Sequence, residues 1–98
     1  MVELSWHRDA KIDLIQIYYY IYKNSVYYSI KTINDIVDLV NNLERLPYMG
    51  RKVPEYDIYN IRELIYKSYR IIYEVQPNKI IIHRIWHSAR NLSNQLIS

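Results

Sequence analysis

The chain has 98 residues, which is enough for one small domain with an economical core, and we expect residues 1–98 to form that single domain. Half of the residues are hydrophobic and 23% are charged, which excludes a largely disordered chain, and the absence of Cys excludes disulfides and thiolate metal sites. The net charge is +3, and without a signal-peptide pattern or a run of about 18 apolar residues the expected location is the cytoplasm, with no membrane contact.

The first elements expected are a short strand and a long helix. Residues 2–6 alternate apolar and polar side chains, which predicts a strand. A helix is expected from Arg8 to about Lys23, because apolar residues recur there at helical spacing along two adjacent stripes. The stripes are Ala10, Leu14, Ile17 and Ile21, and beside them Ile15, Tyr18 and Tyr22. A helix with so broad an apolar surface is expected to be covered by two neighbours.

A second helix follows a short break. Ser25 has the side chain that an N-cap requires, and the helix is expected to run to about Leu46, where Pro47 prevents its continuation. Its predicted apolar face consists of Ile33, Ile36, Val37, Val40 and Leu43. The short connection between the two helices predicts an antiparallel hairpin.

The second half is expected to be mainly strands. Residues 47–60 form the only long loop, in which Gly50, the sole glycine, is expected to take a backbone conformation that other residues resist. Tight turns then separate three strand-like runs. These are Ile61–Tyr66, Tyr69–Val75 and Lys79–Trp86. The tail from Ser88 to Ser98 is expected to form a short helix.

The order β-α-α-β-β-β, followed by a short C-terminal helix, predicts an α+β fold. The simplest packing is an antiparallel sheet on an N-terminal helical hairpin. The residues expected to be buried together are Ile33, Val37, Val40, Ile71, Tyr73 and Ile81.

Strict alternation along the last two strands assigns their side chains to two faces. On the first of these strands, Arg70, Ile72 and Glu74 are expected opposite Tyr69, Ile71, Tyr73 and Val75. On the second, Ile80, Ile82, Arg84 and Trp86 are expected opposite Ile81, His83, Ile85 and His87.

The second half is also basic. Residues 47–98 contain eight of the 13 Lys and Arg and four of the ten acids, which suits a polyanion or an acidic partner. A solvated basic face is the alternative. Arginine is suited to planar contact with phosphate or carboxylate. The anion- or RNA-binding candidates are Arg51, Arg62 and Arg84, together with Arg70 and Arg90.

Each of these arginines also has an alternative role. It can form an ion pair with Glu55, Glu63 or Glu74, or donate to a backbone carbonyl. His87, at the end of the last strand, can act as a general acid or base, or it can bond backbone where the sheet ends. No metal is expected, because His83 and His87 lack a third ligand nearby, and no phosphate-binding loop predicts a cofactor.

Four segments together resemble the RelE/ParE toxin superfamily, also called plasmid stabilisation proteins. They are residues 47–55 (PYMGRKVPE), 61–64 (IREL), 69–75 (YRIIYEV) and 81–92 (IIHRIWHSARNL). The resemblance extends from Trp6 to Leu92 and implies the same β-α-α-β-β-β fold. It also implies a toxin of a type II toxin–antitoxin system, silenced by a cognate antitoxin that docks on the apolar first helix and the exposed sheet.

The superfamily contains two activities that the fold alone does not separate. The RelE branch cleaves mRNA on the ribosome, and the ParE branch poisons DNA gyrase. The resemblance matches Arg70 and Arg90 to RelE catalytic arginines, but the two RelE strand lysines fall at Ile61 and Glu63, and the RelE C-terminal tyrosine falls near Leu96. These departures favour a ParE-like growth inhibitor over an mRNA endoribonuclease. A decayed module that binds an antitoxin without toxicity is a further alternative.

If the chain is an enzyme, the resemblance implies a metal-independent endoribonuclease. His87 would then move the proton of the attacking 2′-hydroxyl, while Arg70 and Arg90 would stabilise charge on the phosphate. These three are the candidate catalytic residues, and both arginines are expected near solvent.

Overall fold

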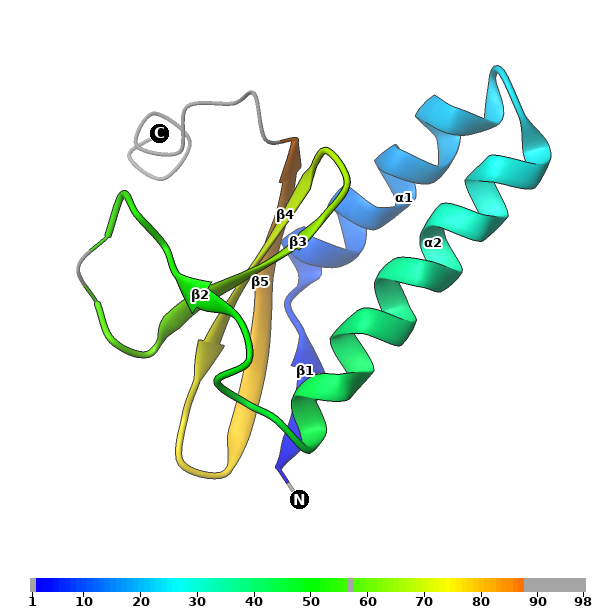
Figure 1. Ribbon diagram of the computed structural model, residues 1–98. Helices are drawn as coiled ribbons and strands as arrows, with labels where there is room; N and C mark the ends of the chain where they lie inside the picture. Colours follow the sequence, from blue (N-terminus) through cyan, green and yellow to red (C-terminus); the bar gives the residue numbers. More distant parts are fainter. Residues whose placement is uncertain (1, 57, 88–98) are drawn as a thin grey trace.

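The computed structural model describes residues 2–56 and 58–87, and its helical hairpin lies on one side of a five-stranded sheet (Figure 1). The elements are β1 (Glu3–Trp6), α1 (Arg8–Tyr22), α2 (Val26–Asn41), the 3-10 turn η1 (Asn42–Glu44), β2 (Arg51–Lys52), β3 (Ile61–Tyr66), β4 (Tyr69–Val75) and β5 (Lys79–His87). Neither described helix is long and apolar enough to cross a membrane. The expected C-terminal helix lies outside the described residues.

Side-chain caps set where both helices begin. The Ser25 hydroxyl accepts a hydrogen bond from the Tyr28 backbone N–H at 3.1 Å, which confirms the predicted N-cap of α2. His7 caps α1 in the same way, its Nδ1 accepting from the Asp9 N–H at 3.0 Å. The α-helical part of α2 ends at Asn41, earlier than predicted, because η1 tightens the last turn before Pro47.

The sheet has the order β1-β5-β4-β3-β2 and is mixed. The strands β3, β4 and β5 are antiparallel as predicted, but β1 pairs parallel with β5, so the sheet is not wholly antiparallel. Parallel pairing is possible here because β1 and β5 are joined by a long connection and not by a hairpin. The two-residue strand β2 was not predicted, since it is too short to show alternation.

A β-bulge in β5 changes which face of the sheet its later side chains lie on. Ile72 pairs with Arg84, but Tyr73 pairs with Ile82, so His83 is an extra residue in the strand. As a result Ile85 packs in the hairpin-side core, while Trp86 packs on the opposite face. The predicted alternation of β5 is therefore wrong beyond His83, whereas the predicted faces of β4 are confirmed.

The main core lies between the hairpin and the sheet. Of the residues predicted to be buried together, Val40, Ile71 and Tyr73 are fully buried in it, and Ile33 packs against it half-buried. Val37 and Ile81 are only half-buried and lie outside this cluster, so this part of the prediction is wrong. The buried line of α2 is rotated relative to the predicted face and includes Ser29, Thr32, Ile36 and Val40.

A smaller core covers the opposite face of the sheet. Ile72 of β4 and Trp86 of β5 are buried there against Val53, with Tyr56 and Ile61 packed around them. The loop after β2 therefore folds back over the sheet and places Val53 and Tyr56 on this outer face.

Gly50 is required for space and not for an unusual backbone angle, so the predicted conformation is wrong. A Cβ at this position would lie 2.5 Å from the Glu63 carbonyl oxygen and 2.6 Å from the Tyr73 hydroxyl. The Tyr73 hydroxyl accepts from the Gly50 N–H at 2.9 Å and donates to the Pro47 carbonyl at 2.9 Å. One buried tyrosine thus joins the loop to the sheet.

Candidate functional site

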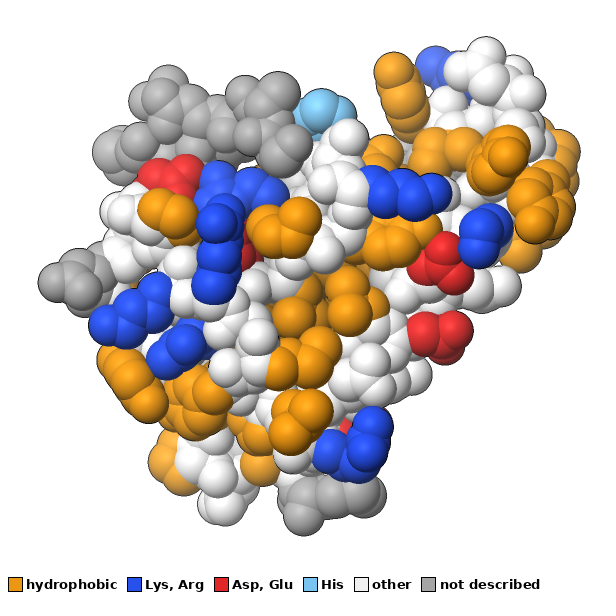
Figure 2. All heavy atoms as spheres, viewed as in Figure 1, with side chains coloured by type: hydrophobic (Ala, Val, Ile, Leu, Met, Phe, Trp, Pro, Cys, Tyr) orange, Lys and Arg blue, Asp and Glu red, His pale blue; other side chains and the backbone are white. Residues whose placement is uncertain are grey.

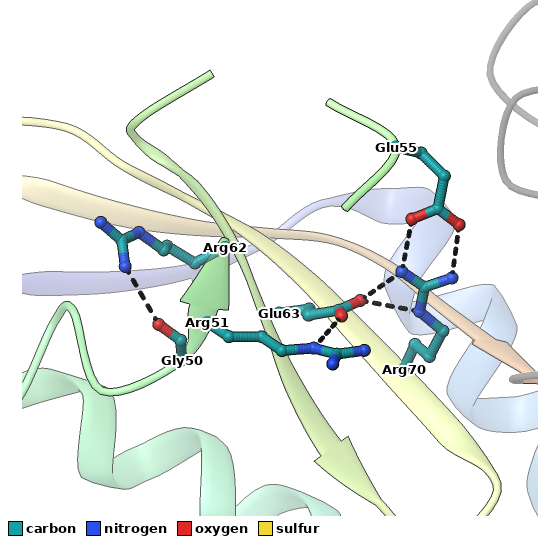
Figure 3. Close-up of polar contacts among 6 residues, drawn as sticks. All are labelled: Gly50, Arg51, Glu55, Arg62, Glu63 and Arg70. Atoms are coloured by element: carbon teal, nitrogen blue, oxygen red, sulfur yellow. Dashed lines mark hydrogen bonds and ion pairs between the residues drawn. The ribbon is translucent and has the colours of Figure 1, made fainter. Parts of the chain in front are cut away.

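Four charged side chains form a continuous chain across the outer face of the sheet, in the order Arg51, Glu63, Arg70 and Glu55 (Figure 3). Arg51 of β2 binds one carboxylate oxygen of Glu63 on β3. Arg70 of β4 donates from Nε to the other oxygen at 2.7 Å. Its two terminal nitrogens bind the Glu55 carboxylate at 2.8 and 2.9 Å. We call this set the charge chain.

The centre of the charge chain is removed from solvent. The Glu63 side chain is fully buried, and that of Arg70 is 8% exposed. The hydrogen bonds that Arg70 donates to Glu55, followed by those to Glu63, raise the pKa of Arg70 above its ordinary value. The same bond to Arg70 lowers the pKa of Glu55. Both groups are therefore held in their charged forms.

This arrangement changes the interpretation of Arg70. The side chain was expected near solvent, and that expectation is wrong, because Glu63 lies beneath it and Glu55 beside it. The guanidinium nitrogens that would have to contact a phosphate are bonded instead to the carboxylates of Glu63 and Glu55. Arg70 and Arg51 thus follow the ion-pair alternative. An open pocket of about 400 Å³ lies beside them and is lined also by Pro54, Glu55 and Ile65.

Arg62 lies at a different place from Arg51 and Arg70. Its Nε donates to the Tyr59 carbonyl at 3.0 Å, and its Nη1 donates to the Gly50 carbonyl at 3.3 Å. Its guanidinium also lies over the rings of Tyr48 and Tyr59, 5.0 and 4.8 Å from their centroids. Figure 3 shows Arg62 and Arg51 extending in opposite directions from the β2–β3 edge.

Arg84 pairs with a carboxylate 71 residues earlier in the sequence. Its Nε and Nη2 donate to Asp13 of α1 at 2.8 and 3.1 Å, and Asp13 also accepts from the Ile85 backbone N–H at 2.9 Å. The bond to Asp13 raises the pKa of Arg84. This pair joins α1 to β5, so the Arg84 charge is balanced within the fold.

The structure places His87 away from Arg70. His87 pairs with Tyr69 across β4 and β5, while Arg70 pairs with Trp86, so the two side chains belong to opposite faces of the sheet. The His87 ring packs against Tyr69 at 5.8 Å between centroids. It lines a pocket of about 410 Å³ between α1 and the sheet, together with Asp13, Gln16, Ile17, Tyr20, Tyr69 and Ile85.

Arg90, the third candidate catalytic residue, lies outside the described residues. Among residues 2–56 and 58–87, no three His, Asp or Glu side chains are grouped as metal ligands would be. The described candidates are therefore distributed over four places, namely the charge chain with Arg51 and Arg70, the Tyr48–Tyr59 pair with Arg62, the Asp13 pair with Arg84, and the pocket beside Tyr69 with His87.

Sequence reasoning named Glu55 and Glu63 as alternative partners for the arginines, and both are used. It did not find Asp13 or the two tyrosines around Arg62. Asp13 occupies a helix position that resembles a solvated face in the sequence, and its partner is 71 residues away. The stacking of Tyr48 on Arg62 depends on the loop fold, which leaves no periodic signal.

Comparisons with known proteins agree on one group of relatives. A family model described as the ParE toxin of the type II toxin–antitoxin system parDE matches residues 4–92. A chain in the chromosomal ParDE system from P. aeruginosa is 28% identical, with a TM-score of 0.73 over 89% of this chain and 96% of that one. A comparison with curated protein sequences finds no match.

Two more distant solved structures share the fold. A chain of the RelBE2 toxin–antitoxin complex from Mycobacterium tuberculosis is 17% identical in sequence. Its TM-score is 0.62, and the match covers 88% of this chain and 96% of that chain. The YoeB dimer from Staphylococcus aureus is 22% identical, with a TM-score of 0.59 over 88% and 97%. At these identities the likeness concerns the backbone arrangement alone.

Proposed function

Because the chain belongs to the ParE toxin family of type II toxin–antitoxin systems, we propose that it stops growth by acting on DNA gyrase and not by cleaving mRNA. The fold is common to both kinds of toxin and does not separate them. The proposal rests instead on the charges at the outer face of the sheet.

The single observation that carries the proposal is the buried carboxylate of Glu63 between Arg51 and Arg70. A site that stabilises a phosphoryl transition state needs cations directed at the developing negative charge. Here the resemblance places a lysine of the RelE nucleases at the position of Glu63, so a negative charge replaces a positive one. Both neighbouring arginines are engaged with carboxylates, and the charge chain is neutral as a whole.

The position of His87 supports the same conclusion. A general base must lie within hydrogen-bond reach of the proton that it removes, directly or through one water. Since His87 and Arg70 lie on opposite faces of the sheet, one phosphate cannot contact both in this arrangement. A protein that acts by binding gyrase does not need these two residues in one site.

We further propose that a cognate antitoxin covers the helical hairpin. Figure 2 shows apolar side chains gathered over the hairpin in the upper right of the view. The exposed ones include Ile12, Ile15 and Tyr19 on α1 and Tyr27, Tyr28 and Ile30 on α2. A pocket of about 280 Å³ between α1 and α2, lined by Leu14, Ile15, Tyr18, Tyr19 and Ile33, would accept an apolar side chain of the partner. Exposed apolar patches of this kind mark protein interfaces.

The test is induced expression in a bacterial host, with the rate of protein synthesis and plasmid supercoiling measured from the same culture. Loss of supercoiling before any fall in protein synthesis is expected. Arg70→Ala and His87→Ala variants, each checked for folding, are induced in parallel. If the parent chain cleaves mRNA rapidly while supercoiling stays normal, and both substitutions abolish this cleavage, the protein is a nuclease and the proposal is rejected. A folded chain with no effect on growth would favour a decayed antitoxin-binding module.

A further inference from the structure

We propose that Tyr48, Lys52, Tyr59 and Arg62 form a surface that binds a single strand of nucleic acid. We call these four residues the basic–aromatic patch. The patch lies at the β2 edge of the sheet, separate from the charge chain and from the hairpin. The inference goes beyond the proposed function, because it concerns contact with a nucleic-acid strand by the toxin itself, whether or not gyrase is its target.

The aromatic part of the patch is a pair of tyrosines held in place by Arg62. The rings of Tyr48 and Tyr59 lie 5.4 Å apart between centroids, and the Arg62 guanidinium lies over both of them. Arg62 also bonds the carbonyls of Gly50 and Tyr59. These contacts fix two loops of the chain against β3, so the tyrosines are positioned before any ligand binds, which lowers the entropy cost of binding.

Both rings remain accessible. Tyr48 is 45% exposed and Tyr59 is 63% exposed, which leaves ring surface free for a further planar group. Figure 2 shows basic and apolar side chains side by side at the lower left of the view, over the β2 edge. The hairpin lies on the other side of the molecule in that view, so its occupation by a partner would not cover this edge.

The cations of the patch carry charge that the described residues do not balance. Lys52 lies 5.5 Å from the centroid of the Tyr59 ring and forms no ion pair within residues 2–56 and 58–87. In the same part of the chain Arg62 bonds only neutral carbonyls, through Nε and Nη1. This contrasts with Arg51, Arg70 and Arg84, each of which has a carboxylate partner.

An exposed aromatic pair beside two unbalanced cations is the combination that single-stranded nucleic acid requires. Its phosphates pair with the cations and its bases stack on the aromatic faces. An acidic peptide would use the cations but has no planar groups to stack on Tyr48 and Tyr59. A DNA duplex keeps its bases stacked on one another, so it would also leave the two rings unused. Both rings and both charges are used only by an unpaired strand.

The experiment is fluorescence anisotropy with the purified full chain and a labelled oligodeoxythymidine of about 20 nucleotides, longer than the footprint of one small binding domain. Lys52→Ala and Tyr59→Ala are each expected to raise Kd about tenfold, whereas Tyr59→Phe keeps the ring and should bind as the parent does. Lys52→Ala should also reduce the slope of log Kd against log salt by about 0.7. The matched controls are Lys11→Ala and Tyr19→Ala, at exposed positions on α1.

A duplex of the same length and polyglutamate are titrated in parallel. The proposal expects tighter binding to the single strand than to either. No binding to the single strand overturns it, and so does binding that Lys52→Ala and Tyr59→Ala leave unchanged. If polyglutamate binds more tightly than the oligonucleotide, and Lys52→Ala weakens that binding, the patch is a binding site for an acidic protein and the proposal is overturned. Circular dichroism confirms that each variant is folded.

Discussion

Glu63 on β3 accepts a 2.7 Å hydrogen bond from Arg70 Nε on β4, although the Glu63 side chain is completely buried. A buried carboxylate is tolerated only when cations and hydrogen-bond donors compensate it. Arg51 and Arg70 supply that compensation on the two oxygens of Glu63. The pairing fixes the register of β2, β3 and β4 at one point, and it uses both guanidinium groups for structure.

We expect Glu63→Ala to be strongly destabilising. The substitution leaves the nearly buried Arg70 with Glu55 as its only carboxylate partner, and breaking a buried ion pair costs about 3–5 kcal/mol. Urea denaturation of parent and variant measures this cost. Glu3→Ala, at an exposed position of β1, is the matched control and should stay within about 0.5 kcal/mol of the parent. A Glu63→Ala protein as stable as Glu3→Ala would contradict the buried pairing.

The Glu55–Arg70 contact predicts a loss of stability in acid. Because Arg70 lowers the pKa of Glu55, the folded state favours the ionised carboxylate. This contribution is complete above the ordinary glutamate pKa of 4.5 and is lost as the pH falls through the depressed value. Thermal melting between neutral pH and pH 3 should therefore show a smaller pH dependence for Glu55→Gln than for the parent. Equal pH dependence would show that Glu55 does not pair with Arg70 in solution.

Tyr73 and Gly50 provide a test of the loop contacts. Tyr73→Phe removes the hydroxyl that bonds the Gly50 N–H and the Pro47 carbonyl, and unsatisfied buried groups cost about 1–3 kcal/mol. Gly50→Ala should also destabilise, because its Cβ would meet β3 backbone and the Tyr73 ring. Chemical denaturation measures both, with Tyr19→Phe on α1 as the control. Parent-like stability of Gly50→Ala would mean that the loop lies further from β3.

Asp13 should stabilise the attachment of α1 to β5. Asp13→Ala removes the partner of Arg84 and leaves the Ile85 N–H without its acceptor, which we expect to cost about 3 kcal/mol. Asp13→Asn keeps one acceptor oxygen and should cost less. Hydrogen exchange at the Ile85 amide gives a local readout, since it should accelerate in Asp13→Ala. An unchanged exchange rate in that variant would rule out the Asp13 contact.

The proposed antitoxin surface can be tested by placing a charge on it. Ile15 is 54% exposed on α1, so Ile15→Arg should leave the fold intact. The same substitution should weaken antitoxin binding at least tenfold, because a desolvated charge would replace an apolar contact. Ile58→Arg, at a similarly exposed loop position, is the control. Calorimetric titration with the antitoxin measures both. If Ile58→Arg weakens binding and Ile15→Arg does not, the partner uses the loop face instead.

The elements of the fold could be predicted because their signals are local. Ser25 has N-cap chemistry, and the alternation along Tyr69–Val75 gives the faces of β4 correctly. The facing of β5 could not be predicted, since the bulge at His83 depends on pairing with β4 and leaves an apparently regular alternation in the sequence. The parallel pairing of β1 with β5 could not be predicted either, because it depends on tertiary packing and leaves no local signal in the sequence.

The site was less predictable than the fold. The arginines at positions 51, 62, 70 and 84 predicted a site for an anion, but the sequence could not show that Arg51, Arg70 and Arg84 pair with carboxylates of the protein while Arg62 bonds two backbone carbonyls. Glu63 alternates with apolar residues like any strand residue, and only the packing of β2 and the loop over it makes it buried. Asp13 and Arg84 are too far apart in sequence for spacing to link them.

Purified gyrase with relaxed plasmid, assayed in parallel with a reconstituted ribosome translating a defined mRNA, separates the two possible targets of the toxin. We expect the toxin to block ATP-dependent supercoiling or to accumulate cleaved plasmid, the cognate antitoxin to reverse this effect, and the mRNA to stay intact. Unimpaired supercoiling together with toxin-dependent cleavage of the ribosome-bound mRNA would contradict action on gyrase.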